Sequence, residues 1–439
     1  MLELFITLSR YFFAFFIFYF LLQGVIYVLI ERGKLLKDPK FPIIKQRITI
    51  VLIHLMGFSI LYFWNEEILM IGVHWLLIYF VSLFVIPKVY KSTCPLMWNG
   101  LFFLTSVSLI ILSRLNFNLA MQQIVWLFLS MLVIMFLPLI LKILPKIESM
   151  NYLYLGLGLI ILLSAFLGVE EFGSRRRIEI PGTDFGFAPA EATSFLYILY
   201  LATSFRKRLS FREIIIPSAF AVLFVAILFF QRNLGAALIF FVSYMILMYV
   251  STGRALLFVA GFGLFTVGAF ISYHVFYHVQ VRVSVWLNPW AYVHGIGYQT
   301  IQSLFAIGTW GPFGSGLTLG IPWRVPVVSR DLTYAAIAEE FGTFFAIMLL
   351  GIYIMIFYRG VHIALRANRR YYSLLTIGFT SVLAFQTFLI IGGTVSIIPL
   401  TGVTLPFISY GGSSLLISTV MIGMIQWLFM QRRMEEEEN

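Results

Sequence analysis

Long apolar segments, separated by short polar stretches, constrain this chain more than any other feature of its sequence. Of its 439 residues, 61% are hydrophobic and 11% are charged, whereas soluble domains carry roughly a quarter charged residues. A helix needs about 20 apolar residues to cross a bilayer. Segments that approach this length lie near residues 11–30, 48–64, 68–87, 97–113, 119–141, 151–169, 190–204, 213–230, 234–250, 255–276, 334–358, 373–398 and 408–430. The pattern predicts an all-α fold, a polytopic bundle of about thirteen transmembrane helices.

Cysteine and histidine usage leaves little room for disulfides or metal clusters. Cys94 is the single cysteine, which excludes an intramolecular disulfide framework and a cysteine-based metal cluster. The six histidines match no ligand motif such as HExxH. His274 and His278 flank an aromatic pair, where packing at the membrane interface and metal binding are both open. No metal site is predicted.

The net charge of +11 reflects basic residues in the short loops between apolar segments, and it indicates contact with membrane lipids rather than nucleic acid. Loops 31–47, 205–212 and 359–370 are rich in these residues. With thirteen spans the three loops fall on one side, which predicts an N-terminus outside and a cytoplasmic C-terminus. The start of the chain is not basic, so no cleavable signal peptide is expected. Residues 435–439 should form an acidic, solvated tail.

Three longer segments then lie on the outer face, at residues 170–189, 277–333 and 399–407. The second is by far the longest, and long loops in compact proteins are usually functional. It is rich in glycine, proline and tryptophan, a mixture that suits glycine turns and aromatic anchors at the interface. We therefore expect residues 277–333 to form a folded lid.

Three carboxylates near the end of this lid are candidates for chemistry. Asp331 is the only carboxylate between residues 277 and 333, and it could cap the following helix or act as an acid or base. Glu339 and Glu340 follow within an apolar segment, where burying an ionisable group costs on the order of 3 kcal/mol. They are functional candidates, and the alternative is an ion pair with an arginine of a neighbouring span.

Several arginines of the outer segments run against the usual orientation bias. Arg175 and Arg176 belong to the run GSRRR, Arg232 follows at another outer turn, and Arg282 lies at the start of the lid. Guanidinium groups match phosphate oxygens well. Charge alone leaves two interpretations open, a clamp for a diphosphate lipid and contact with anionic phospholipid headgroups.

Residues 401–414, with the sequence TGVTLPFISYGGSS, do not suit a simple lipid-facing helix. They combine adjacent glycines, a proline and several hydroxyl groups beside an apolar segment. Irregular backbone at membrane depth is tolerated only where it is buried in protein or lines a water-filled cavity. The segment therefore predicts a polar internal site.

Long motifs in a matching order make residues 97–434 resemble the SEDS family, which includes RodA, FtsW and SpoVE proteins. The motifs are GSRRR followed by FAPAE, QRNLGAALI, GIGYQTIQSLFAIGTWGPFGSGLTLG, RDLTYAAIAEEFG and TGVTLPFISYGGSS. The resemblance implies a ten-span core, placed here at residues 91–434 with the lid at 277–333. Residues 1–90 would then add three spans, expected to serve packing or partner docking.

The resemblance also implies a function in bacterial cell-wall synthesis for shape, division or sporulation. Family members look like peptidoglycan glycosyltransferases that polymerise lipid II at the outer face of the cytoplasmic membrane, with a class B penicillin-binding protein as partner. Carried over by motif, Asp331 corresponds to the essential aspartate, the base for the acceptor hydroxyl. Substrate contacts are expected from Arg175, Arg176, Glu191, Arg232, Arg282, Gln302, Ser303, Glu339, Glu340, Pro406, Ser409, Tyr410, Gly411, Gly412 and Ser413. No cofactor is required by this chemistry, although a divalent cation could assist.

The motifs also depart from the family pattern. A lysine common in the family is replaced by Ser194, a carboxylate by Asn233, and a frequent asparagine by Ile390. Arg232 and Arg330 could substitute for the missing charges. A divergent member could alternatively be a lipid II flippase or a non-catalytic scaffold for a penicillin-binding protein.

Overall fold

The computed structural model describes residues 2–35, 38–144, 147–171, 174–179, 186–207 and 211–438. Its long helices are α1 Leu2–Glu31, α2 Lys40–Tyr62, α3 Ile68–Val89, α4 Pro95–Leu115, α5 Phe117–Ile143, α8 Phe211–Phe230, α9 Leu234–Thr252, α10 Ala255–Val275, α14 Thr343–Leu365, α15 Arg370–Thr394 and α16 Gly412–Glu438. In these ranges, 11 helices are long and apolar enough to cross a membrane. The all-α transmembrane bundle is thus confirmed.

Two further predicted spans form shorter helices, α6 Asn151–Ser164 and α7 Pro189–Ser204. They contain 14 and 16 residues, fewer than the roughly 20 that a bilayer crossing usually needs. The two helices pack against each other, and α7 also packs on α15 and α16. A total of thirteen spans therefore stays a prediction.

Helix α4 lies in the middle of one half of the bundle. Every residue from Leu96 to Arg114 is buried, and the helix contacts α2, α3, α5 and α14. Its polar side chains find partners on the N-terminal helices. Asn99 donates a 3.0 Å hydrogen bond to Gln46 of α2, and Ser106 lies 2.9 Å from Nδ1 of His54. The region 1–90 therefore shares one core with the rest of the chain.

The predicted span 334–358 is not one helix. The chain forms α13 Thr333–Phe341, breaks at Gly342 and continues as α14. Gly342 has a φ of +93°, a backbone conformation that favours glycine. A Cβ atom there would lie 2.2 Å from the carbonyl oxygen of Pro312. Glu339 and Glu340 thus lie at the end of a short helix, not within a continuous span.

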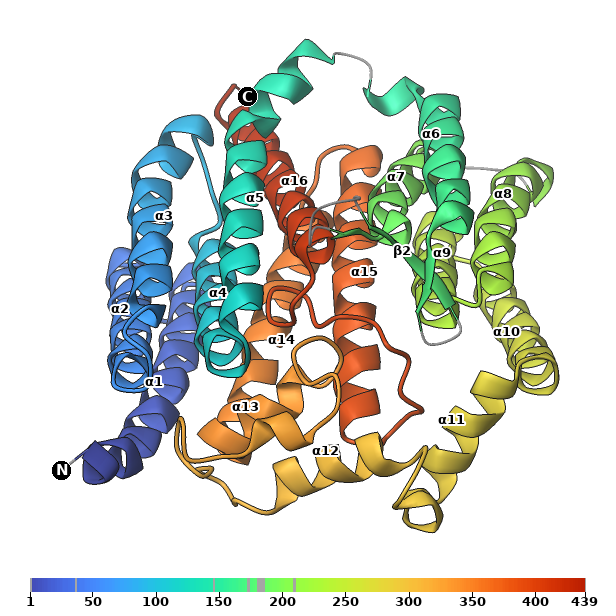
Figure 1. Ribbon diagram of the computed structural model, residues 1–439. Helices are drawn as coiled ribbons and strands as arrows, with labels where there is room; N and C mark the ends of the chain where they lie inside the picture. Colours follow the sequence, from blue (N-terminus) through green and yellow to red (C-terminus); the bar gives the residue numbers. More distant parts are fainter. Residues whose placement is uncertain are drawn as a thin grey trace.

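The predicted lid contains α11 Tyr277–Leu287 and α12 Tyr298–Gly308, with short 3₁₀ turns at Pro289–Tyr292 and Pro322–Arg324. Figure 1 shows α12 lying across the lower end of the bundle, beside α13. The N-terminus lies at this end and the C-terminus at the opposite end. The two termini thus lie at opposite ends of the bundle, and the predicted orientation, with the C-terminus in the cytoplasm, stays a prediction.

Two smaller features were not expected from the sequence. The outer segment 170–189 contains short antiparallel strands, β1 Val169–Glu171, β2 Ser174–Glu179 and β3 Gly186–Phe187. The acidic tail, predicted to be simply solvated, continues α16 as far as Glu438. Nε of Arg432 lies 2.9 Å from a carboxylate oxygen of Glu436, one helical turn further on, and such pairs favour the helix.

Candidate functional site

A cavity of about 180 Å³ lies among α7, α9, α15 and α16 and the loops before α13 and α16. Two arginines and two carboxylates line it, Arg177, Arg330, Glu191 and Asp331. The polar lining is completed by Ser194, Asn233, Gln386, Thr404, Tyr410, Ser413, Ser414 and Ser418. We call this the first cavity. Charged and hydroxyl-bearing residues thus meet in one cavity, whose lining is completed by apolar residues such as Ile239, Phe240 and Met421.

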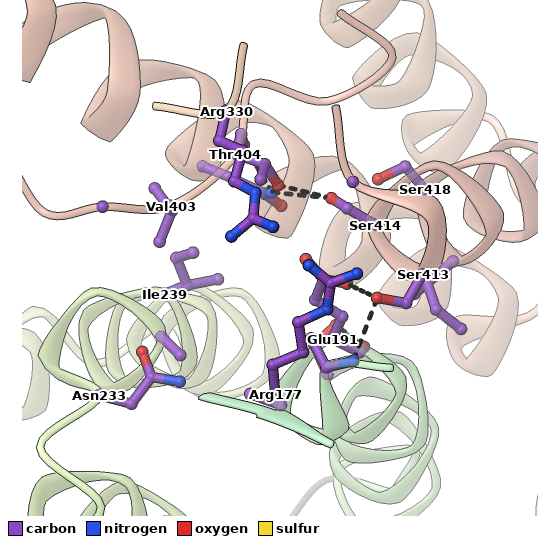
Figure 2. Close-up of a pocket in the computed structure, with 18 of the residues that line it drawn as sticks. Arg177, Glu191, Asn233, Ile239, Arg330, Val403, Thr404, Ser413, Ser414 and Ser418 are labelled. Atoms are coloured by element: carbon purple, nitrogen blue, oxygen red, sulfur yellow. Dashed lines mark hydrogen bonds between the residues drawn. The ribbon is translucent and has the colours of Figure 1, made fainter. Parts of the chain in front are cut away.

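The two arginines approach the first cavity from different parts of the chain. Figure 2 shows the guanidinium groups of Arg177 and Arg330 pointing into the same space. Arg177 belongs to β2, and a Cβ atom at Gly186 of β3 would lie 1.8 Å from its Nε, so only glycine admits this path. The Arg330 guanidinium lies 5.9 Å from the ring centre of Tyr410. Two convergent guanidinium groups suit phosphate oxygens.

Glu191 connects two helix starts at the wall of the cavity. Its side chain projects from the first turn of α7 and accepts a 2.6 Å hydrogen bond from Oγ of Ser413, at the start of α16. Ser413 in turn accepts a 3.2 Å bond from the backbone N–H of Ala188. Figure 2 shows this chain of bonds. The carboxylate is therefore held in place by the motif that the sequence singled out.

The segment before α16 is held by backbone and side-chain bonds. Nε2 of Gln386 donates a 2.9 Å hydrogen bond to the Thr404 carbonyl, and Oγ1 of Thr404 donates one of 2.8 Å to Ser414. At Gly412, a Cβ atom would lie 1.9 Å from Nε1 of Trp126 in α5. Gly412 thus allows α16 to begin directly against α5. This close packing explains why the second residue of the Gly411–Gly412 pair is glycine.

Asp331 lies two residues before α13, and the N-cap position belongs to Leu332. The loop that carries it is fixed by neighbouring bonds. Thr333 donates from its hydroxyl to the Ser329 carbonyl at 3.0 Å, and the Tyr410 N–H donates to the same carbonyl at 2.8 Å. Asp331 is partly exposed and lines the first cavity. The loop thus places Asp331 at the wall of the cavity.

Asp331 also lines a second cavity of about 140 Å³ beneath the lid. Its wall contains Arg282 and Trp286 of α11, Gln299 and Thr300 of α12, and residues near the end of α15. Val327, Asp331 and Gly402 line both cavities. Arg282 donates a 3.2 Å hydrogen bond to the Thr401 carbonyl. The structure thus places Asp331 at the boundary between the two cavities.

Several predicted residues lie outside both cavities. Arg232 is exposed in the turn before α9, with a φ of +58°. Ser303 of α12 is buried and donates a 3.0 Å hydrogen bond to the Thr394 carbonyl of α15, and Gln302 beside it is half-buried. Arg232, Gln302 and Ser303 line neither cavity. The position of Ser303 favours a structural role, and that of Arg232 favours a role at the surface.

The same holds for two residues of the 401–414 motif. The Pro406 carbonyl accepts a hydrogen bond from the Tyr353 hydroxyl of α14. Ser409 is buried, and its carbonyl accepts a 3.3 Å bond from Nε2 of Gln123. Tyr410, Gly411, Gly412 and Ser413 do line the first cavity. Arg175 and Arg176 have backbone in β2, but their side chains lie outside the described residues.

Glu339 and Glu340 hold the lid to α13 instead of facing a cavity. Oε1 of Glu339 accepts a 2.8 Å hydrogen bond from the Ile321 N–H. Oε1 of Glu340 lies 3.2 Å from Nε of Arg114, and both side chains are buried. The ion pair with an arginine of a neighbouring span, which the sequence left open, is present. It fits a structural role for Glu340.

Several residues that line the first cavity were not predicted from the sequence, and they differ in how far the sequence could have indicated them. Arg177 was present in the GSRRR run, but the strand register that turns it inward was not visible. Gln386 was detectable as an amide within an apolar span. Thr404 and Ser414 lie in the motif already singled out. Asn233 and Arg330 were noted as departures, and both line the first cavity.

Metal binding by protein side chains finds no support in the described part of the chain, which contains no group of three or more histidine, cysteine or acidic side chains that could hold an ion. Glu191 and Asp331 are two carboxylates of one cavity. A divalent cation would therefore need further oxygen ligands from a bound phosphate.

Comparison with known proteins gives a consistent match. The family model for FtsW, RodA and SpoVE, described as cell cycle protein, matches residues 87–434. The RodA peptidoglycan glycosyltransferase of Mycobacterium tuberculosis is 36% identical over 272 residues, which cover 58% of each chain. The chain thus spans less than two thirds of that protein's length. RodA of Mycobacterium leprae is 33% identical over 70% of this chain and 69% of its own. Stage V sporulation protein E of Bacillus subtilis is 32% identical, over 61% of this chain and 74% of its own.

Solved structures share the fold. A chain from a structure described as "Structural coordination of polymerization and crosslinking by a peptidoglycan synthase complex" matches with a TM-score of 0.66 and 22% identity, covering 78% of this chain and 98% of that one. RodA of Thermus thermophilus, a rod shape determining protein, matches with a TM-score of 0.57, 23% identity and the same coverage. The family match over residues 87–434 thus agrees with the fold. This chain belongs to the FtsW/RodA/SpoVE family.

Proposed function

We propose that this protein is a peptidoglycan glycosyltransferase that joins lipid II units into glycan strands at the outer face of the bacterial cytoplasmic membrane. The observation that carries the proposal is the position of Asp331, a residue that lines both cavities. A polymerase must bring a donor and an acceptor sugar to one reactive point. A carboxylate between two cavities meets that requirement. The names of the mycobacterial relatives also support it.

The first cavity suits the diphosphate end of the donor. Arg177 and Arg330 direct their guanidinium groups into it, and guanidinium groups bind phosphate oxygens through paired hydrogen bonds. The same charges would stabilise the diphosphate as it leaves. Glu191 and Ser413 lie at the wall of this cavity and would orient donor hydroxyl or amide groups. Arg175 and Arg176 stay predictions as further cations of the same strand.

The second cavity suits the acceptor sugar. Its polar wall is provided by Arg282, Gln299 and Thr300, with the indole of Trp286 beside them. Amide, hydroxyl and aromatic groups are common partners for sugar hydroxyls and rings. An acceptor placed here would reach the donor only past Asp331, because that residue and its neighbours Val327 and Gly402 form the shared wall.

In the proposed reaction, the Asp331 carboxylate takes the proton of the acceptor 4-hydroxyl group. The acceptor oxygen forms a bond to the anomeric carbon of the donor, and the bond from that carbon to the diphosphate oxygen breaks. Undecaprenyl diphosphate leaves with the electron pair, its charge held by the arginines. The carboxyl proton then passes to water, and the base is restored.

We further propose that a class B penicillin-binding protein is the partner and that the C-terminus is cytoplasmic. One fold neighbour comes from a complex described as coordinating polymerization and crosslinking, which supports such a pairing. The lid and the N-terminus lie at the end of the bundle opposite the C-terminus. With the lid outside, the reaction end faces the wall and the C-terminus faces the cytoplasm.

The proposal is tested with the purified full-length protein and fluorescent lipid II, with and without its partner. We expect labelled glycan strands on a gel and release of undecaprenyl diphosphate. Movement of lipid II across liposome membranes without strand formation would contradict the proposal and indicate a flippase. Neither activity, in a stable complex with an active transpeptidase, would indicate a scaffold.

A further inference from the structure

One residue of the N-terminal helical region, Trp64, contacts a buried arginine at the reaction end of the bundle. The family match covers residues 87–434, whereas Trp64 lies in the turn between α2 and α3. The guanidinium carbon of Arg114 lies 4.3 Å from the Trp64 ring centre and 4.9 Å from that of Trp323 in the lid. One buried arginine thus contacts a tryptophan from each region.

Arg114 is also the centre of a polar cluster that fixes the lid to α13. Its Nε pairs with Glu340 at 3.2 Å, and its Nη2 donates to the carbonyls of Thr318 and Gly320 at 3.3 Å each. We call residues 311–324 the strap. The strap is therefore held to the end of α13 by one side chain from α4.

Backbone bonds add to this attachment. The N–H groups of Ser315 and Gly316 donate to the carbonyls of Glu339 and Glu340, at 2.9 and 3.0 Å. The space here is narrow, because a Cβ atom at Gly314 would lie 2.5 Å from the backbone nitrogen of Gly342. Backbone bonds therefore join the strap directly to the end of α13, and α13 begins two residues after Asp331.

Helix α1 also contacts both the strap and the end of α13. The ring centres of Phe13 and Phe341 lie 4.8 Å apart, and those of Tyr11 and Phe313 lie 4.9 Å apart. Arg10 donates a 3.3 Å hydrogen bond to the Gly314 carbonyl. Residues of α1 thus contact the strap and α13 directly, whereas Trp64 of the α2–α3 turn reaches them through Arg114.

We propose that the N-terminal helices brace the base of the lid, with Trp64 as a positioning residue that keeps Asp331 at the boundary of the two cavities. Trp64 acts through Arg114. Its ring covers the guanidinium, limits the access of water to the buried Arg114–Glu340 pair and so keeps the strap on α13. The effect on rate rests on the function proposed above, whereas the effect on the strap does not.

The test compares Trp64→Leu with Trp64→Tyr, which retains an aromatic ring, and with Phe63→Leu, a neighbouring exposed residue of the same turn. All are made in the full-length protein. Hydrogen exchange of residues 311–324 and 333–341 is measured first, because it needs no substrate. We expect faster exchange in Trp64→Leu and exchange close to wild type in the other two variants.

Polymerisation of lipid II is measured next. We expect kcat of Trp64→Leu to fall about two- to fivefold, the effect of a cation–π contact whose aromatic ring is largely exposed, with KM for lipid II unchanged. Wild-type exchange in Trp64→Leu would overturn the brace, and so would an equal change in Phe63→Leu or no rescue by Trp64→Tyr. Faster exchange with an unchanged kcat would overturn the positioning role. If the wild type makes no glycan, the exchange result still decides the brace.

Discussion

Ser413 at the start of α16 donates a 2.6 Å hydrogen bond to the carboxylate of Glu191 in the first turn of α7. The two residues are separated by more than two hundred positions in the chain. Their bond closes one wall of the first cavity, where both side chains line the space. The wall of the proposed donor site is therefore built by two motifs that are remote in sequence.

This bond should be visible as energetic coupling. We expect Glu191→Ala and Ser413→Ala each to lower the stability of the protein, and the double variant to lose less than the sum of the two. Residues of one hydrogen bond show coupling of about 0.5–3 kcal/mol. Thermal unfolding in detergent of the wild type, both single variants and the double variant measures it. Strictly additive losses would show that the bond contributes nothing.

Two arginines that the sequence offered as substitutes for missing family charges should behave differently. Arg330 lines the first cavity, whereas Arg232 is exposed outside both cavities. We expect Arg330→Gln to weaken binding of undecaprenyl diphosphate by roughly ten- to hundredfold, the effect of a charged hydrogen bond. Arg232→Gln should change it less than about threefold, as surface substitutions do. Equal losses in a binding assay would contradict the assigned cavity.

The glycine at the start of α16 should tolerate no side chain. At Gly412, a Cβ atom would lie 1.9 Å from Nε1 of Trp126, while at Gly263 in α10 nothing lies within 4 Å. We expect Gly412→Ala to destabilise the protein by about 1–3 kcal/mol through overpacking. Gly263→Ala should be neutral or slightly stabilising, because alanine favours helices. Thermal unfolding of both variants provides the comparison, and a neutral Gly412→Ala would argue against the close packing of α16 on α5.

A divalent cation, if it assists, should bind with the substrate. The described residues contain no cluster of three acidic, histidine or cysteine side chains that could hold an ion, so a cation would need phosphate ligands. We expect Mg²⁺ to leave the melting temperature of the substrate-free protein unchanged, and to raise it only when undecaprenyl diphosphate is present. Stabilisation by Mg²⁺ alone would reveal a protein-only site.

The sequence predicted the helical bundle well because apolar runs report directly on membrane helices. It also predicted the polar site, since glycines and hydroxyl groups beside an apolar segment conflict with lipid exposure. The break at Gly342 was not predicted, because hydropathy does not register a positive φ. Glycine is required at position 342 because the Pro312 carbonyl lies against it. This contact exists only after folding.

The choice among candidate side chains depended on long-range geometry that no local pattern contains. Glu340 could have faced substrate or an arginine, and only the fold shows that Arg114, 226 positions away, is its partner. Arg177 enters the first cavity because of the register of β2 with β3. By contrast, the motif that contains residues 410–413 did predict residues that line the first cavity. These residues are neighbours both in sequence and in space.

The central claim is that the Asp331 carboxylate acts as the base between the two cavities. The most direct measurement is the rate of lipid II polymerisation by Asp331→Asn, which keeps the shape of the side chain but cannot accept the proton. We expect kcat to fall by about 10²- to 10⁴-fold, the usual contribution of a general base, with an unchanged melting temperature. Glycan strands formed at the wild-type rate by this variant would contradict the account.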